Sequence, residues 1–398
     1  MSSPRSRRRR GRERIYLVPG FFGFSTLGEI RYFGHVREFL AKNLWTDGGV
    51  EVHVVRTPPT SSLRTRAARL LETIAATAGS GDDPIHLVGH SSGGLDVRLL
   101  LVPGASLPTT AEPSPVLRRV RTAVTVSAPH RGTPVASFFT GLLGQRLLGL
   151  LSLSTMYVLR FGRLPVGVLL RMGAVFARLD RHLGVNSALL DQLFGQLLGD
   201  FTPARRRAIA SLMGDVRRDQ DLLVQLTPAG ADLLDATATA PPWVRCGSVL
   251  TVASPPGVSG MIAAGLDPTA QATHAIYRVL YEIAARGRPV AGPLDPRQAA
   301  AIRRFYGGLP EPTANDGLVP TLAQAWGEII DVARADHLDV IGHFHDPRHR
   351  PPHVDWLFTG SGFDRPAFEV VWSRIVAFLA AARPPGRGRR ARADAVSR

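Results

Sequence analysis

The stretch LVGHSSGG, residues 87–94, sets two glycines and two serines directly after a short apolar run. Gly89, Ser91 and Gly93 match the pattern G-x-S-x-G. The run before them is typical of a buried strand, and GGLDVRLL (93–100) is typical of a helix. A strand, a sharp turn and a helix in this order favour a nucleophile elbow, with Ser91 exposed in a strained turn. An ordinary Gly-Ser turn is the alternative interpretation.

Short apolar runs alternate with helical patterns on both sides of this motif. Strands are expected at 14–20, 50–58, 84–90, 120–130, 243–254 and 327–337, and helices at 62–79, 93–101, 268–307 and 366–382. Strands that alternate with helices predict a mostly parallel central sheet flanked by helices, which is an α/β fold. Residues 138–179 are helical and apolar, but their longest uncharged run is 13 residues. A membrane-spanning helix needs about 20.

The predicted organisation is one α/β domain with a helical lid or cap inserted in it. Its parts are a basic tail (1–13), the first part of the core (14–135), the inserted cap (136–240), the second part of the core (241–383) and a second basic tail (384–398).

The net charge of +16 is concentrated at the chain ends, where eleven of the sixteen charges fall within residues 1–14 and 383–398. Tails of like charge stay solvated and can meet an anionic membrane surface. The body shows neither a basic face with interleaved aromatics nor a nucleic-acid-binding module, so no specific nucleic-acid partner is expected. The oligomeric state is left open. Cys246 is the only cysteine, which excludes an intramolecular disulfide, and its apolar setting predicts an inert buried thiol. No signal peptide is evident, which predicts a cytoplasmic protein that starts near residue 1.

A serine nucleophile requires a base and an acid, and the C-terminal part of the chain supplies both. In an elbow fold the acid and then the histidine follow the serine along the chain. ANDGLVP (314–320) places Asp316 in a loop, and RADHLD (334–339) places His337 after a strand-like run. His337 is therefore the predicted base and Asp316 the predicted acid, with Asp295 or Asp267 as substitutes if ANDG is only a turn.

The oxyanion formed in such chemistry requires two backbone N–H donors. Ser92 follows the nucleophile and opens the next helix, and Phe21 lies in the early loop VPGFFGF (18–24). These two amides are the expected oxyanion hole. Four further histidines (His343, His345, His349 and His353) occur in GHFHDPRHRPPH, which fits either a metal site or a surface loop, and the surface loop is favoured.

Taken together, these segments resemble the bacterial triacylglycerol lipases of the α/β-hydrolase superfamily, in particular the Pseudomonas–Burkholderia group. The resemblance implies an α/β-hydrolase fold, a mobile lid and hydrolysis of lipid esters through an acyl-enzyme on Ser91. One departure is Pro19, which stands where the family usually has a histidine. The motifs that carry the likeness are PGFFGF (19–24), GHSSGGLDVR (89–98), SAPHRGTPVA (127–136), LTPAGADLLDA (226–236), NDGLVP (315–320) and HLD (337–339).

No cofactor is expected for the reaction itself. The resemblance implies a structural calcium near the histidine loop, where Asp339 matches one ligand position and His343 stands where a carbonyl-type ligand is expected. The upstream acid of such a site is not identifiable from the sequence, so the site is left open.

The inserted helices would shelter an acyl chain, since each buried methylene contributes about 0.8 kcal/mol. An immobile helical subdomain is the alternative. The arginines of the insertion are expected at its rim or against lipid phosphates (Arg146, Arg160, Arg163 and Arg171).

Three functions remain in view. The first is a serine ester hydrolase, and the second is an acyltransferase or polyhydroxyalkanoate depolymerase with the same three residues. The third is a non-catalytic protein that binds membranes or nucleic acid through its arginine-rich tails.

Overall fold

A computed structural model describes most of the chain. The described residues are 12–21, 32–44, 49–79, 81–161, 164–180, 187–257, 262, 264–286, 294–346, 348, 355 and 357–382. Nearly all of both basic tails falls outside them.

Six strands form one parallel sheet in the order β2-β1-β3-β4-β5-β6. The predicted α/β class is confirmed, and the topology is that of an α/β-hydrolase core. The strands are β1 (Glu13–Val18), β2 (Val50–Val54), β3 (Ile85–His90), β4 (Val120–Val126), β5 (Arg245–Thr251) and β6 (Glu328–Ala333).

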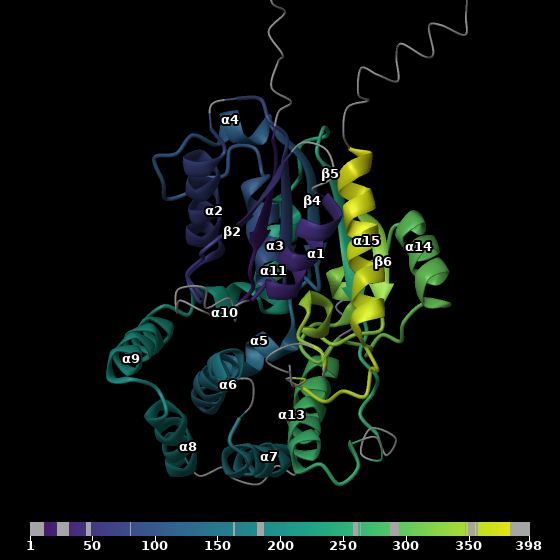
Figure 1. Ribbon diagram of the computed structural model, residues 1–398. Helices are drawn as coiled ribbons and strands as arrows, with labels where there is room; N and C mark the ends of the chain where they lie inside the picture. Colours follow the sequence, from purple (N-terminus) through teal and green to yellow (C-terminus); the bar gives the residue numbers. More distant parts are fainter. Residues whose placement is uncertain are drawn as a thin grey trace, which may run out of the picture.

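Helices cover both faces of this sheet (Figure 1). The flanking helices are α1 (Gly34–Leu44), α2 (Leu63–Thr77), α3 (Ser92–Leu100), α4 (Pro113–Leu117), α14 (Pro296–Tyr306) and α15 (Arg365–Ala381). Successive side chains of a strand point to opposite faces. In β1, Ile15 and Leu17 therefore join the core with α1 and α15, whereas Tyr16 and Val18 join the core with α2 and α3.

A second group of helices lies beyond one end of the sheet (Figure 1). It comprises α5 (Pro134–Phe139), α6 (Leu142–Phe161), α7 (Val166–Asp180), α8 (Ser187–Gly199), α9 (Pro203–Arg218) and α13 (Pro268–Ala285), and α10 (Asp221–Gln225) and α11 (Pro228–Thr237) lead back to the core. No helix of the described residues combines the length and apolarity that a bilayer crossing requires.

The cap draws on more of the chain than residues 136–240. Helix α13, which comes after β5, packs on α7 so closely that a side chain at Gly173 would lie 3.2 Å from the Cα of Ala272. The sequence pattern marked 268–307 as helical, but it carried no sign that α13 leaves the sheet to join the inserted helices.

Candidate active site

The turn after β3 has the strained geometry that the elbow motif predicts. Ser91 has φ 55° and ψ −133°, a conformation that costs a non-glycine residue on the order of 1–3 kcal/mol. Its backbone N–H donates to the Val126 carbonyl at 2.9 Å. A side chain at Gly89 would lie 2.6 Å from the carbonyl carbon of Gly93, and one at Gly93 would run into the Val18 carbonyl oxygen. Both positions therefore require glycine.

Three side chains from distant loops meet at this turn. Ser91 Oγ lies 2.9 Å from His337 Nε2, and His337 Nδ1 lies 2.8 Å from Asp316 Oδ2. A carboxylate only accepts hydrogen bonds, so Nδ1 carries the proton and Nε2 is free to accept one from Ser91. The structure thus brings together the three residues selected from the sequence as nucleophile, base and acid.

Asp316 is held in place from several sides. Its two oxygens accept five hydrogen bonds, one of them from Gln324, a residue that no sequence motif marks. The donors are the amides of Leu318 and Val319 on Oδ1, and the side chains of Thr251, Gln324 and His337 on Oδ2. The two alternative acids lie elsewhere in the structure: Asp267 caps α13 and Asp295 caps α14.

The loop after β1 lies directly against the nucleophile. A side chain at Gly20 would come within 2.6 Å of Ser91 Cβ and 3.0 Å of its Oγ. Phe21 follows Gly20 in the chain and Ser92 follows Ser91, so both backbone amides lie close to this contact. Phe21 also lines the same pocket as Ser91 and His337. Their role as oxyanion donors stays a prediction.

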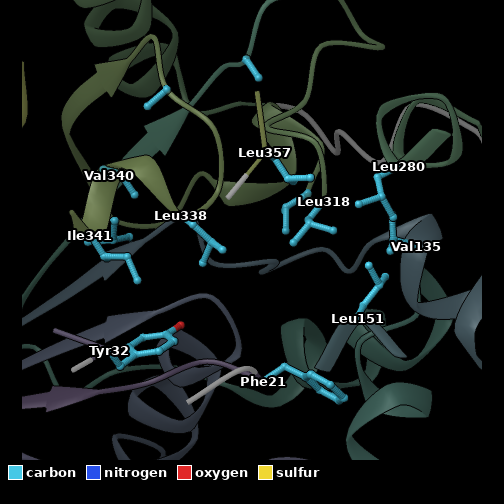
Figure 2. Close-up of a cluster of buried hydrophobic side chains, with 14 of the residues drawn as sticks. Phe21, Tyr32, Val135, Leu151, Leu280, Leu318, Leu338, Val340, Ile341 and Leu357 are labelled. Carbon is cyan, nitrogen blue, oxygen red and sulfur yellow. The ribbon is translucent and has the colours of Figure 1, made fainter. Parts of the chain in front are cut away.

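An apolar pocket opens beside Ser91, with an empty volume of about 600 Å³ that includes its open mouth. Apart from Ser91, His337 and Thr133, its walls are apolar and come from the core, from α5, α6 and α10, and from α13. Figure 2 shows a cluster of buried hydrophobic side chains. Five of its labelled residues line the pocket, and they lie in the centre and right of the view (Phe21, Val135, Leu151, Leu280 and Leu318). A pocket of this kind fits a hydrocarbon chain, and its apolar walls provide no charged side chain to pair with a charged ligand.

Three carboxylates gather at the loop that carries His337. Oxygens of Asp336, Asp339 and Asp355 lie within 4.8 Å of one another. Burial raises the pKa of Asp336 to about 7, and burial together with the two neighbouring acids raises the pKa of Asp339 well above its usual range. Asp339 Oδ1 is buried and has no hydrogen-bond partner among the described residues. An oxygen-rich cluster with an unsatisfied carboxylate oxygen fits a hard cation such as Ca²⁺.

The calcium ligands expected from the sequence and this carboxylate cluster share one residue. Asp339 belongs to the cluster, but Asp336 and Asp355 were not identified because no spacing rule links them. His343 points elsewhere and donates from Nε2 to the Tyr32 carbonyl at 3.0 Å. His343 is also buried, so the surface-loop prediction is wrong there, whereas His345 is exposed. His349 and His353 lie outside the described residues.

The structure also places Cys246 and two of the arginines of the insertion. Cys246 is half-buried at the start of β5 rather than fully buried, and burial raises the pKa of its thiol to about 12, which keeps it protonated. Of the arginines placed at the cap rim, Arg146 lies 3.8 Å from Asp191 and Arg171 donates to Gln196. Arg163 and the side chain of Arg160 are not described.

No family model matches the chain. A solved metagenomic carboxyl esterase is 20% identical with a TM-score of 0.47 (92% of this chain, 75% of that one). EstA from Clostridium botulinum is 18% identical with a TM-score of 0.49 (90% and 88%), and Staphylococcus hyicus lipase is 15% identical with a TM-score of 0.49 (93% and 96%). Over 130 residues, 32% of the chain, it is 29% identical to a triacylglycerol lipase of Vibrio cholerae. That segment is 36% of the relative, so the chain spans about a third of the lipase that it resembles.

Proposed function

We propose that the chain is a serine-dependent carboxylic ester hydrolase whose substrates carry an apolar acyl group. The contact of Ser91 Oγ with His337 Nε2 at 2.9 Å, at the mouth of an apolar pocket, is the observation that carries this proposal. The partial likeness to a protein named triacylglycerol lipase supports the same class.

In the first half of the reaction, Ser91 Oγ attacks the ester carbonyl carbon while His337 Nε2 takes the hydroxyl proton. The negative charge that develops on the carbonyl oxygen is stabilised by the amides of Phe21 and Ser92. Asp316 accepts a hydrogen bond from the N–H at His337 Nδ1 and stabilises the imidazolium. His337 then returns its proton to the leaving alkoxide, and an alcohol departs.

In the second half, a water molecule attacks the acyl-enzyme and gives a proton to His337. The ester bond to Ser91 breaks, the proton returns to Ser91 Oγ, and a carboxylic acid leaves. The pocket excludes bulk water from the acyl chain and gains binding free energy from each methylene that it buries.

The test is hydrolysis of p-nitrophenyl butyrate by the parent and by Ser91→Ala. We expect kcat to fall by at least about 1,000-fold, because the nucleophile is lost while the pocket remains. Ser152→Ala is a matched control, since Ser152 is also a buried serine and its hydroxyl has no partner among the described residues. A parent without esterase activity, or a Ser91→Ala variant that keeps most of it, would contradict the proposal.

We also propose that Asp336, Asp339 and Asp355 hold a calcium ion with a structural role. The ion would neutralise three packed carboxylates and join the loop after β6 to the segment before α15. It supplies no step of the reaction.

A further inference from the structure

We infer that Tyr32 and His90 are positioning residues, whose side chains form a hydrogen-bond relay that sets the oxyanion loop and His337 at a fixed distance from each other. The inference rests on the proposed ester hydrolysis and adds two residues that neither contact the pocket nor belong to the three-residue site.

The relay begins at the peptide unit that joins Pro19 to Gly20, one residue before Phe21. Its carbonyl oxygen accepts a hydrogen bond from Arg66 Nη2 at 2.8 Å, and its N–H donates to the Tyr32 hydroxyl at 3.1 Å. Arg66 is fully buried and paired with the equally buried Asp96. Both polar groups of this peptide unit are therefore anchored, which fixes its plane and the direction in which the chain enters Phe21.

The Tyr32 hydroxyl is also hydrogen-bonded to His90, the next residue of the relay. The two atoms Tyr32 Oη and His90 Nδ1 are 2.6 Å apart, and His90 Nε2 lies 2.8 Å from the carbonyl oxygen of His337. A carbonyl only accepts, so Nε2 carries the proton and Nδ1 must accept from the tyrosine. Every link then has one donor and one acceptor: Gly20 N–H to Tyr32, Tyr32 O–H to His90, and His90 N–H to His337.

His90 is suited to a fixed relay because it stays neutral. It is fully buried, and burial lowers its pKa well below the usual range for histidine. The direction of the hydrogen bonds is consequently the same across the pH range in which an esterase is assayed.

The two ends of the relay hold the parts of the site that must stay aligned. At one end, Gly20 lies against Ser91 and leads into the Phe21 amide. At the other end the His337 backbone is held twice, because its N–H donates to the Asp316 carbonyl at 3.1 Å and its C=O accepts from His90. His343 donates a hydrogen bond to the Tyr32 carbonyl, so the segment that follows His337 contacts Tyr32 at a second point.

Removal of the tyrosine hydroxyl tests the relay with the smallest change. In Tyr32→Phe the ring keeps its packing, while the Gly20 N–H and His90 Nδ1 lose their partner. For p-nitrophenyl butyrate we expect kcat to fall by about 10- to 100-fold with KM within about twofold, since a displaced oxyanion donor weakens only transition-state binding. Tyr16→Phe is the matched control, because Tyr16 is a buried tyrosine whose hydroxyl lies 2.8 Å from Thr77 Oγ1 at the end of α2, and Tyr16 does not line the pocket.

Substitutions at His90 separate a relay from two unrelated packing effects. His90→Leu removes both hydrogen bonds and should lower kcat like Tyr32→Phe, whereas His90→Gln keeps one donor and one acceptor and should recover part of the loss. In the double variant Tyr32→Phe/His90→Leu, kcat should stay within about threefold of the worse single variant, because residues of one network are not additive.

The outcomes distinguish this inference from the proposed function. A parent that does not hydrolyse the ester contradicts the proposed function. An active parent whose folded Tyr32→Phe variant has unchanged kcat contradicts the relay alone. If Tyr32→Phe does not fold, equal kcat in His90→Leu, His90→Gln and the parent contradicts it instead.

Discussion

Single residues in strained conformations mark the site more sharply than composition does. Among the described residues, two non-glycine residues have positive φ, Ser91 at 55° and Ser127 at 51°. Both come directly after neighbouring strands, β3 and β4. Ser127 Oγ lies 2.9 Å from Thr251 Oγ1, which in turn donates to Asp316. The strained backbone conformations thus occur at Ser91 and at a residue linked to Asp316 through Thr251. Tight packing around both positions maintains the strain.

The sequence identified Ser91, Asp316 and His337 because each lies in a local motif close to a strand end. It did not identify Tyr32, His90, Thr251 or Gln324 as supporting residues. These four act through contacts between residues far apart in sequence, and no periodicity or spacing records such contacts.

Asp316→Asn tests the acid at the residue scale. The substituted amide would face the donors of Thr251, Gln324 and His337, and it would place an N–H against one of them or favour the wrong histidine tautomer. We expect kcat for p-nitrophenyl butyrate to fall by roughly 10³- to 10⁴-fold with the fold intact. Steady-state kinetics and a thermal melt measure this. A folded variant with kcat within tenfold of the parent would show that Asp316 is not the orienting acid.

At the scale of elements, the alternation of strands and helices predicted the sheet well. All six expected strands occur, and most differ from the expected ranges only in that they are shorter at their ends. The cap was harder to predict. An apolar amphipathic pattern indicates a helix but not the element that it packs against, so the packing of α13 on α7 could not be predicted.

Helix α6 forms one wall of the apolar pocket beside Ser91, so under the proposed function we expect it to set the preferred acyl-chain length. Leu151 lies on α6, is buried and lines the pocket. Leu151→Phe should fill part of the space, lowering kcat/KM for p-nitrophenyl octanoate by about tenfold relative to the butyrate, equal to the loss of one to two buried methylenes. Competition assays with both esters measure the ratio.

Leu170→Phe is the control for this prediction. Leu170 lies on α7, is about half exposed and does not line the pocket, so its substitution should leave the chain-length ratio unchanged. An equal change of ratio in the two variants would mean that the cap as a whole, rather than the α6 wall, governs chain length.

For the whole molecule, the parallel sheet explains how residues 246 positions apart meet. Strands that all run in one direction deliver their following loops to the same edge, so the loops after β1, β3 and β6 converge there. The loop that carries His337 also carries Asp336 and Asp339, while Asp355 comes from the segment before α15. The assignment to the Pseudomonas–Burkholderia group stays a prediction, since it rests on motifs alone.

Calcium should therefore stabilise the whole fold. An ion held by Asp336, Asp339 and Asp355 binds the native state and not the unfolded chain, so a concentration of 100 times Kd adds about 2.7 kcal/mol of stability. For a chain of this size that corresponds to a rise in Tm of roughly 3–4 °C. Differential scanning calorimetry in calcium and in EDTA should show this rise for the parent and not for Asp339→Asn. Asp232→Asn, which changes an exposed aspartate on α11, should keep the full rise. Equal Tm values for the parent with calcium and with EDTA would mean that the three carboxylates are neutralised by protons alone.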